Sequence, residues 1–186
     1  SEKLKKELVN IIDDMEKKFP KFLEMLSTII QRFPNENFYL RPHPLEKIDI
    51  WQENFSRFKN VKISKDGNIN EQLVKSKILI HNSCTSAFHS FFYKIPTISY
   101  EPIECSSGYG EAANELSERV KKVDDLCDII NKINNHNYKI SFEEQKKNIF
   151  KKKVYNLNSK YSSEIIVDEW KKILTFSADS QLDLKK

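Results

Sequence analysis

One stretch of the sequence decides the fold: Ile78-Leu79-Ile80-His81-Asn82-Ser83-Cys84-Thr85-Ser86, followed by an apolar segment at residues 87 to 93 and then by Pro96-Thr97-Ile98-Ser99-Tyr100. A continuous apolar run is typical of a buried strand, and the segment after the polar loop has the length of a short helix. Neighbouring parallel strands need a crossover, which is usually a helix. The stretch therefore predicts a strand, a loop, a helix and a second, parallel strand.

The same alternation continues on both sides of this unit. The apolar run at residues 38 to 40 and the short stretch Val61-Lys62-Ile63 predict two more strands, and Val120 is expected in a short last strand. Residues 4 to 30 carry apolar side chains at helical spacing and predict one long or two short helices, with a break or kink at Pro20. The sequence thus predicts an α/β, Rossmann-like fold, with a parallel sheet of four to six strands and helices on both faces.

The chain is long enough for one compact domain with a helical addition. We expect residues 1–140 to form the Rossmann-like domain, residues 141–176 to form a helical extension packed on it, and residues 177–186 to be disordered. Residues 105 to 115 are polar and are expected to form a mobile loop. Because the chain enters a helical pattern directly at Ser1, we expect it to be part of a longer protein.

Composition narrows the class of protein. The 31 Lys and Arg residues are balanced by 27 Asp and Glu residues, and the two signs are interspersed, which argues against nucleic acid as a partner. The three cysteines are too few and too widely spaced for a disulfide framework or a metal site. No apolar run is long enough for a membrane span. We therefore expect a cytoplasmic protein that uses no metal.

Chemistry is expected in the loops after the strands, because parallel α/β sheets bind ligands outside the carboxyl ends of their strands. The first such loop is Arg41-Pro42-His43-Pro44, in which two prolines stiffen the backbone that carries a guanidinium and an imidazole. It is interpreted as an anion site, and the alternative is a plain turn.

The second loop places three hydroxyl groups, those of Ser83, Thr85 and Ser86, where a strand runs into a helix. Free N–H groups at a helix start attract phosphate, although Ser and Thr are also ordinary helix caps. Glu101, after the fourth strand, is a candidate acceptor for ribose hydroxyls or else an exposed loop carboxylate. His81 and His89 are expected to be packed or edge residues.

Four stretches, in their order along the chain, resemble the C-terminal half of bacterial surface-carbohydrate biosynthesis proteins. They are Arg41-Pro42-His43-Pro44, Asn60-Val61 with Gly67-Asn68-Ile69, Ser83-Cys84-Thr85-Ser86, and Pro96-Thr97-Ile98-Ser99-Tyr100. They are similar to capsule and lipopolysaccharide glycosyltransferases of the two-Rossmann-domain (GT-B) kind that use CMP-linked acidic sugars such as Kdo or sialic acid, and to CDP-glycerol polymerases. The resemblance covers residues 20 to 105.

The resemblance implies roles for individual residues. His43 and Pro44 stand where the His-Pro motif of those enzymes meets the nucleotide phosphate and base, and Ser83, Thr85 and Ser86 stand where their Ser/Thr motif binds phosphate. Arg41 and Glu101 are added from their position at strand ends. Cys84 interrupts the usual pair of hydroxyl residues, so which hydroxyl meets the phosphate is left open.

The resemblance also implies what this chain lacks. The substrate would be a nucleotide-sugar donor, with no cofactor and no metal. The catalytic base and the site for a glycan or glycolipid acceptor would belong to an N-terminal half, so this chain would hold no catalytic residue and be inactive alone. Peripheral association with the inner face of the plasma membrane fits such a role. The alternatives are a nucleotide-sugar epimerase of the same architecture and a non-catalytic scaffold of a polysaccharide export cluster.

Overall fold

The computed structural model describes residues 2–105, 110–140, 144–154 and 160–182. Within these residues the chain forms eight helices and five short strands. In chain order they are α1 (Glu2–Arg32), β1 (Phe38–Leu40), α2 (Ile48–Phe55), β2 (Val61–Ile63), α3 (Ile69–Leu73), β3 (Leu79–His81), α4 (Ser86–Phe92), β4 (Thr97–Tyr100), α5 (Glu111–Glu115), β5 (Glu118–Val120), α6 (Val123–Asn134), α7 (Glu144–Lys153) and α8 (Ser162–Leu182).

The chain divides into two compact units, Ser1–Lys146 and Lys147–Lys186. The first unit contains all five strands, and the second contains α8 and most of α7. The division falls inside α7 rather than at the predicted position after residue 140. Helix α8 continues to Leu182, through residues that the sequence predicts to be disordered, and residues 183–186 lie outside the described residues.

All strand pairing is parallel, as the sequence predicts. Strand β1 pairs with β2, with Leu40 opposite Ile63, and β4 pairs with both β3 and β5, with Ser99 opposite His81 and Arg119. The prediction of one continuous sheet is wrong in this respect, because the strands form a two-stranded sheet, β1-β2, and a three-stranded sheet, β3-β4-β5. The strands are three or four residues long, at the short end of the usual range, so each pair makes few ladder hydrogen bonds.

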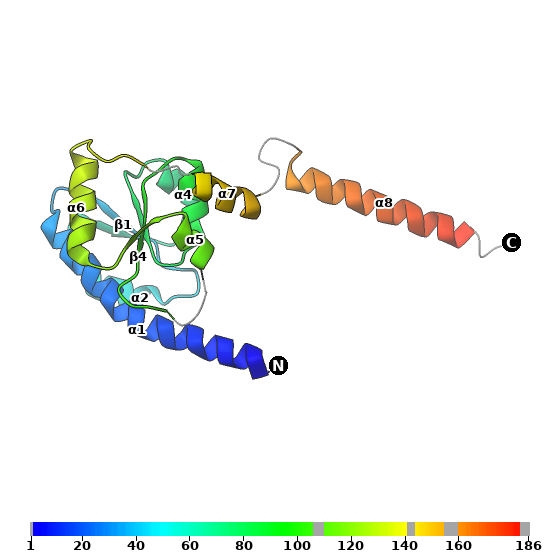
Figure 1. Cartoon of the computed structure of the whole chain (residues 1–186). Coiled ribbons are helices and arrows are strands. Elements are labelled where there is room, and N and C mark those ends of the chain that lie inside the picture. Colours follow the sequence, from blue (N-terminus) through cyan, green and yellow to red (C-terminus); the bar gives the residue numbers. More distant parts are fainter. Residues whose placement is uncertain (1, 106–109, 141–143, 155–159, 183–186) are drawn as a thin grey trace. The chain divides into compact units, whose positions relative to one another are not determined.

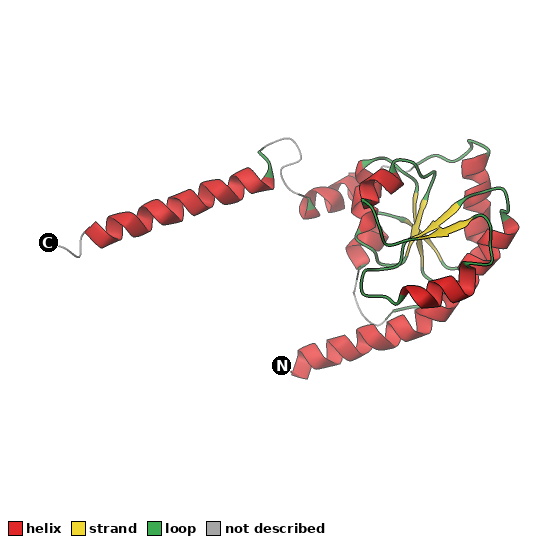
Figure 2. Ribbon diagram, turned by 180° about the vertical axis from the view of Figure 1, so that it is seen from behind, coloured by secondary structure: helices red, strands yellow, loops and turns green. Residues whose placement is uncertain are grey.

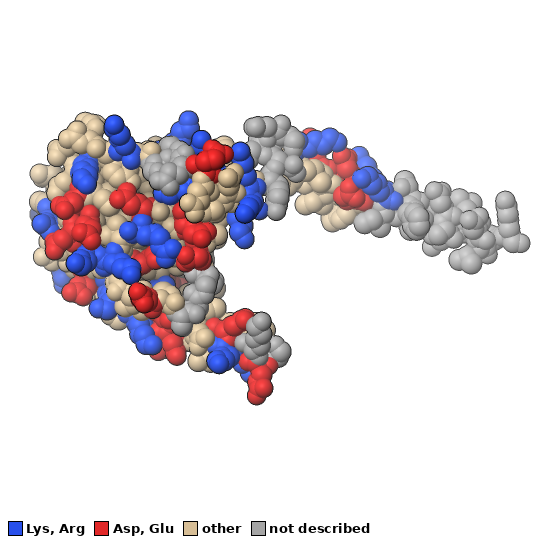
Figure 3. Space-filling model, viewed as in Figure 1, with Lys and Arg blue, Asp and Glu red and all other residues tan. Residues whose placement is uncertain are grey.

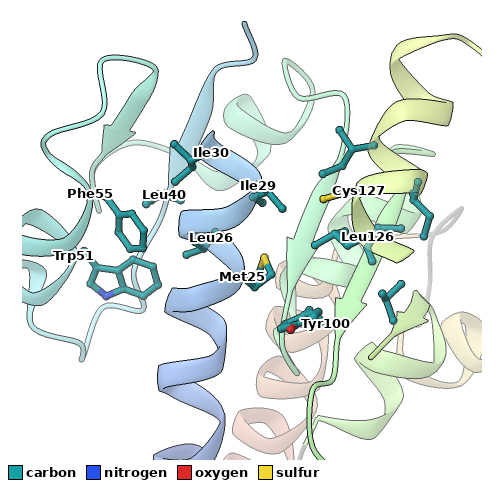
Figure 4. Close-up of a cluster of buried hydrophobic side chains, with 14 residues drawn as sticks. Met25, Leu26, Ile29, Ile30, Leu40, Trp51, Phe55, Tyr100, Leu126 and Cys127 are labelled. Atoms are coloured by element: carbon teal, nitrogen blue, oxygen red, sulfur yellow. The ribbon is translucent and has the colours of Figure 1, made fainter. Parts of the chain in front are cut away.

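Helices cover both faces of the strands (Figure 1, Figure 2). Helices α1 and α6 contact each other, and α4 contacts α3 and α5 on the opposite side of the second sheet. One hydrophobic core joins the two sheets across α1. Figure 4 shows Leu26 and Ile30 of α1 on the side of Phe55, while Met25 and Ile29 lie on the side of β4 and α6. The fold is therefore α/β, with small parallel sheets between two layers of helices.

Helix α1 is a single helix with Pro20 inside it, so the alternative of two helices is wrong. Proline removes one backbone hydrogen bond, and packing on both sides of it compensates. Phe19 meets the edge of Trp51 at 6.0 Å between ring centroids, and Phe22 lies 6.4 Å from Tyr100. The N-terminal half of the helix leaves its apolar side chains about half exposed, among them Leu4, Leu8, Val9, Ile12 and Met15.

One local prediction needs correction. The polar segment expected to be a loop contains α5, which begins after Gly110, while residues 106–109 lie outside the described residues. The error arises because polar residues fit a turn and a short helix equally well. Asn68 caps α3, because its side-chain oxygen accepts a hydrogen bond from the Asn70 N–H at 2.9 Å.

Candidate functional site

The carboxyl ends of β3, β4 and β5 lie at one edge of the second sheet, since these strands are parallel and in register. Asn82, Glu101 and Lys121 are the residues that follow the three strands. The Asn82 side chain donates a hydrogen bond to the Tyr100 carbonyl at 2.7 Å, and Lys18 of α1 donates to the Asn82 side chain at 3.2 Å. The loops after β3 and β4 therefore lie side by side, with a cation from α1 beside them.

The loop after β3 is held in an unusual conformation. Ser83 has a φ of 55°, in the left-handed region that a serine rarely adopts. Its N–H donates to Asn114 Oδ1 at 3.1 Å, and its Oγ accepts from Asn114 Nδ2 at 3.2 Å. Asn114 is buried and also accepts a hydrogen bond from Ser99 Oγ at 2.9 Å. These contacts fix the loop before any ligand arrives.

Gly110 completes the support of this loop. It has a φ of 74°, and a Cβ at this position would lie 2.3 Å from the Cβ of Ser83. Only glycine allows so close an approach with this backbone conformation. The loop after β3 and the start of α5 therefore depend on each other.

Two consecutive N–H groups at the start of α4, those of Thr85 and Ser86, have no acceptor among the described residues. The Thr85 side chain makes no capping bond either. The next two N–H groups, those of Ala87 and Phe88, donate to the carbonyls of Cys84 and Thr85. Unpaired N–H groups at a strand-to-helix turn suit an anionic ligand.

His81, at the end of β3, is a structural residue. Its ring is buried, its Nδ1 accepts from the Cys84 N–H at 3.2 Å, and its Nε2 lies 2.7 Å from Ser117 Oγ. Ser117 Oγ donates to the Ala113 carbonyl at 2.8 Å, so we assign the proton of the neutral ring to Nε2. Burial lowers the pKa of His81 to about 4, so the ring is neutral near pH 7.

Glu101 is buried, with one carboxylate oxygen fully engaged. Arg119 donates to Glu101 Oε2 from Nε at 3.0 Å and from Nη2 at 2.6 Å. The third guanidinium nitrogen, Nη1, donates to Glu111 at 2.6 Å. Within the described part of the chain, the buried Oε1 of Glu101 receives no hydrogen bond. A buried carboxylate oxygen without a donor is costly and marks a candidate contact for a ligand.

Glu101 also lines a hollow of about 590 Å³ along β5 and one side of α6. The other lining residues are Glu118, Arg119, Val120, Lys121, Lys122, Asp125, Asp128, Ile129 and Lys132. Figure 3 shows acidic and basic side chains interspersed over the face it displays. Since the acidic and basic lining residues are equal in number, the hollow offers both donors and acceptors without a strong net charge.

In the loop after β1, Arg41 is engaged within the fold. The Arg41 guanidinium donates to the Asp66 carbonyl at 2.8 Å, to the Gly67 carbonyl at 2.9 Å and to the Gln72 side chain at 3.1 Å. It therefore ties β1 to the loop after β2. The ring of His43 is exposed, and its Nδ1 accepts from the Leu45 N–H at 3.2 Å. Its Nε2 remains available to a ligand.

The structure brings together some of the predicted site residues. Ser83, Thr85 and Ser86 share one loop, and Glu101 lies in the neighbouring loop. The nucleotide contacts of His43 and Pro44 stay predictions, as do the ligand roles of Arg41, Ser83, Thr85, Ser86 and Glu101. The Ser86 hydroxyl donates to Cys84 Sγ at 3.0 Å. His89 is exposed on α4 and pairs with Asn70 at 2.7 Å.

Sequence reasoning missed three residues that support the site: Lys18, Asn114 and Arg119. Each acts on a residue that is distant in the sequence, so the sequence does not show what it contacts. The apolar neighbours of Asn114, Ala113 and Leu116, could at most have marked it as a buried polar residue, because both are buried.

Two further observations concern ligands and membranes. Among residues 2–105, 110–140, 144–154 and 160–182, no group of three His, Cys, Asp or Glu side chains is placed to hold a metal ion. None of the helices in the same residues combines the length and the apolar character needed to cross a bilayer.

Comparison with known proteins gives no match at a significant level, whether with protein-family models, with curated protein sequences or with solved structures. We therefore infer a function from the geometry and chemistry of the site itself.

Proposed function

We propose that the first unit is a Rossmann-like domain that binds the nucleotide of an activated sugar, as the donor half of a surface-carbohydrate glycosyltransferase. The single observation that carries this proposal is Glu101, directly after β4: Arg119 holds its Oε2, and its buried Oε1 receives no hydrogen bond from the residues that the structure describes. A ribose hydroxyl supplies the missing donor. Protein atoms cover this oxygen, so the ligand would have to displace part of that cover.

The loop after β3 supports a phosphate beside the ribose. The N–H groups of Thr85 and Ser86 are unpaired in the described residues, and Lys18 adds a positive charge where it contacts Asn82. Asn82 links this loop to the carbonyl before Glu101. One nucleoside monophosphate could then bridge the two loops, with its phosphate at Thr85 and Ser86 and its ribose at Glu101.

The chemistry proposed for this half is stabilisation of a leaving group. An acceptor hydroxyl displaces the nucleotide at the donor carbon, and the departing phosphate gathers negative charge. Fixed N–H groups, the Nε2 side of the His43 ring and the Lys18 ammonium stabilise that charge without a metal. The base and the acceptor site are assigned to a preceding domain. The resemblance of residues 41 to 44 to a His-Pro motif favours a cytidine nucleotide, such as a CMP-sugar or CDP-glycerol.

Titration calorimetry with CMP, UMP and cytidine tests the proposal. CMP should bind weakly but measurably, and cytidine should bind far less, because charge-assisted bonds to phosphate give most of the affinity. A preference for UMP would instead favour a nucleotide-sugar epimerase of the same architecture. Absence of binding by both nucleotides would contradict the proposal.

A further inference from the structure

Arg119 holds Glu101 in a way that one hydrogen bond could not. Two nitrogens of the guanidinium, Nε and Nη2, converge on a single oxygen, Glu101 Oε2, at 3.0 and 2.6 Å. The carboxylate therefore has little freedom to exchange its two oxygens, and within the described ranges of the chain Oε1 receives no hydrogen bond. The orientation of Glu101 is set by Arg119.

Arg119 is itself anchored from the other side. Its Nη1 donates to Glu111 of α5 at 2.6 Å, while the strand pairing places Arg119 opposite Ser99, two residues before Glu101. The Arg119 side chain is 46% exposed and the Glu101 side chain is 11% exposed. Both line the hollow, with Arg119 nearer the solvent and Glu101 largely buried. Hydrogen bonding to Glu101 raises the pKa of Arg119, which keeps the guanidinium charged.

We propose that Arg119 is a positioning residue that makes the site selective for ribonucleotides over nucleotides without ribose hydroxyls. This inference rests on the proposed nucleotide-binding function. With Oε2 occupied by the guanidinium, Glu101 presents only an acceptor to the ligand, and a 2′- or 3′-hydroxyl satisfies it. A sugar without these hydroxyls leaves a buried carboxylate oxygen unpaired, which weakens binding.

Lysine is not equivalent to arginine at position 119. A lysine ammonium can approach Glu101 but lacks the planar arrangement of two N–H groups that restrains one oxygen. Arg119→Lys should therefore keep much of the charge balance while it releases the carboxylate. Arg119→Gln removes the charge as well.

The test measures the affinity of the whole chain for CMP and for 2′,3′-dideoxy-CMP by calorimetry. The wild type should prefer CMP by at least about tenfold, the effect expected for hydrogen bonds to a charged group. In Arg119→Lys and Arg119→Gln this preference should fall to about twofold or less, while the affinity for the dideoxy nucleotide changes little, because the phosphate contacts are intact. Thermal unfolding of each variant shows whether it is folded.

Two further variants serve as controls. Glu111→Gln removes the charge of the outer partner of Arg119 but leaves both bonds to Glu101, so it should keep the preference for CMP. Glu101→Gln should reduce the preference, because Arg119 engages the amide oxygen and an NH2 group then faces the ligand in place of a charged acceptor. Glu101→Gln also keeps the proposal testable if the Arg119 variants fail to fold.

The outcomes separate this inference from the proposed function. If the wild type binds neither nucleotide, the proposed function fails. If the wild type binds both equally, the ribose contact of Glu101 is wrong and the selectivity proposal falls with it, while phosphate binding stands. If the wild type prefers CMP and the Arg119 variants keep the same preference, only the role of Arg119 is overturned.

Discussion

Asn114 of α5 holds Ser83, in the loop after β3, through a pair of hydrogen bonds: Oδ1 accepts from the Ser83 N–H at 3.1 Å and Nδ2 donates to Ser83 Oγ at 3.2 Å. The bonds keep Ser83 at a φ of 55°. They connect the strained turn that presents the N–H groups of Thr85 and Ser86 to a buried side chain from a different part of the chain. The shape of the loop is therefore a property of the folded domain.

Replacement of Asn114 by Ala should reduce the free energy of unfolding by roughly 1–3 kcal/mol, because it leaves the buried Ser99 hydroxyl and the Ser83 N–H without their partner. CMP affinity should fall as well, since Ser83 is free to leave the left-handed conformation. Urea denaturation and calorimetry measure the two effects. Asn135→Ala, at the exposed C-cap of α6, is the control and should change neither by a comparable amount.

The two glycines with positive φ give a matched pair. Gly110→Ala places a Cβ 2.3 Å from Ser83 Cβ and should destabilise the domain by about 2–5 kcal/mol, through strain and overlap together. Gly67 has a φ of 78°, but its nearest side-chain atom would be 3.5 Å away. Gly67→Ala should therefore cost only about 1–2 kcal/mol for the backbone conformation. Equal losses in urea denaturation would mean that contact with Ser83 is unimportant.

The sequence predicts local elements better than it predicts contacts between residues that are far apart along the chain. The strands at residues 38–40, 61–63, 79–81 and 97–100 are predictable because each is a short stretch rich in apolar and β-branched residues that ends at a polar loop or a proline. The position of Ser83, Thr85 and Ser86 at a strand-to-helix turn is predictable for the same reason. Glu101 is predictable from its place after a strand.

The partners of these residues are not predictable, because they come from elsewhere in the chain. Arg119 reaches Glu101 across the β4–β5 pairing, and that register is set by the packing of both strands. In the sequence, Asn114 is one of several polar residues of its segment. Only the folded α5 brings it into contact with Ser99. The engagement of Arg41 with the loop after β2 is hidden in the same way, since its acceptors are mainly backbone carbonyls.

Stability should depend on pH through His81. Its folded-state pKa is lowered from 6.5 to about 4, so the unfolded chain takes up a proton first as the pH falls. The stabilisation is fully present above about pH 6.5 and is lost progressively toward pH 4, by about 3 kcal/mol in total. Urea denaturation between pH 7 and pH 5 should show this decline.

The variant His81→Gln tests whether His81 causes this loss of stability. His81→Gln should be less stable at neutral pH, because it disturbs the bonds to Cys84 and Ser117, but its pH dependence should be flatter. His136→Gln removes an exposed histidine and should keep the slope of the wild type. An unchanged slope in His81→Gln would show that other groups cause the decline.

A carboxylate introduced at the start of α4 should prevent nucleotide binding without lowering the stability of the fold. Thr85 is the N-cap of α4 and makes no capping bond, so Thr85→Asp should leave the stability unchanged or raise it by about 0.5–1 kcal/mol. The same charge should repel the phosphate and abolish measurable CMP binding. Ser162→Asp adds one negative charge at the start of α8 and should keep the wild-type affinity. Normal CMP binding by Thr85→Asp would place the phosphate elsewhere.

His43→Ala tests the loop after β1. Loss of one charge-assisted contact to phosphate should weaken CMP binding by about 1.5–3 kcal/mol, roughly ten- to a hundredfold. The thermal midpoint should change little, because the side chain is exposed. His136→Ala removes another exposed histidine and should not affect the affinity. A variant that unfolds before it loses binding would make His43 a structural residue.

Titration of the ¹⁵N-labelled protein with CMP, followed by the chemical shifts of its backbone amides, shows where the nucleotide binds. We expect the largest changes at the N–H groups of Thr85 and Ser86, with further changes at Glu101 and in residues 43 to 46, and an affinity well above that for cytidine. Changes confined to other parts of the chain, or an equal response to cytidine, would contradict this expectation.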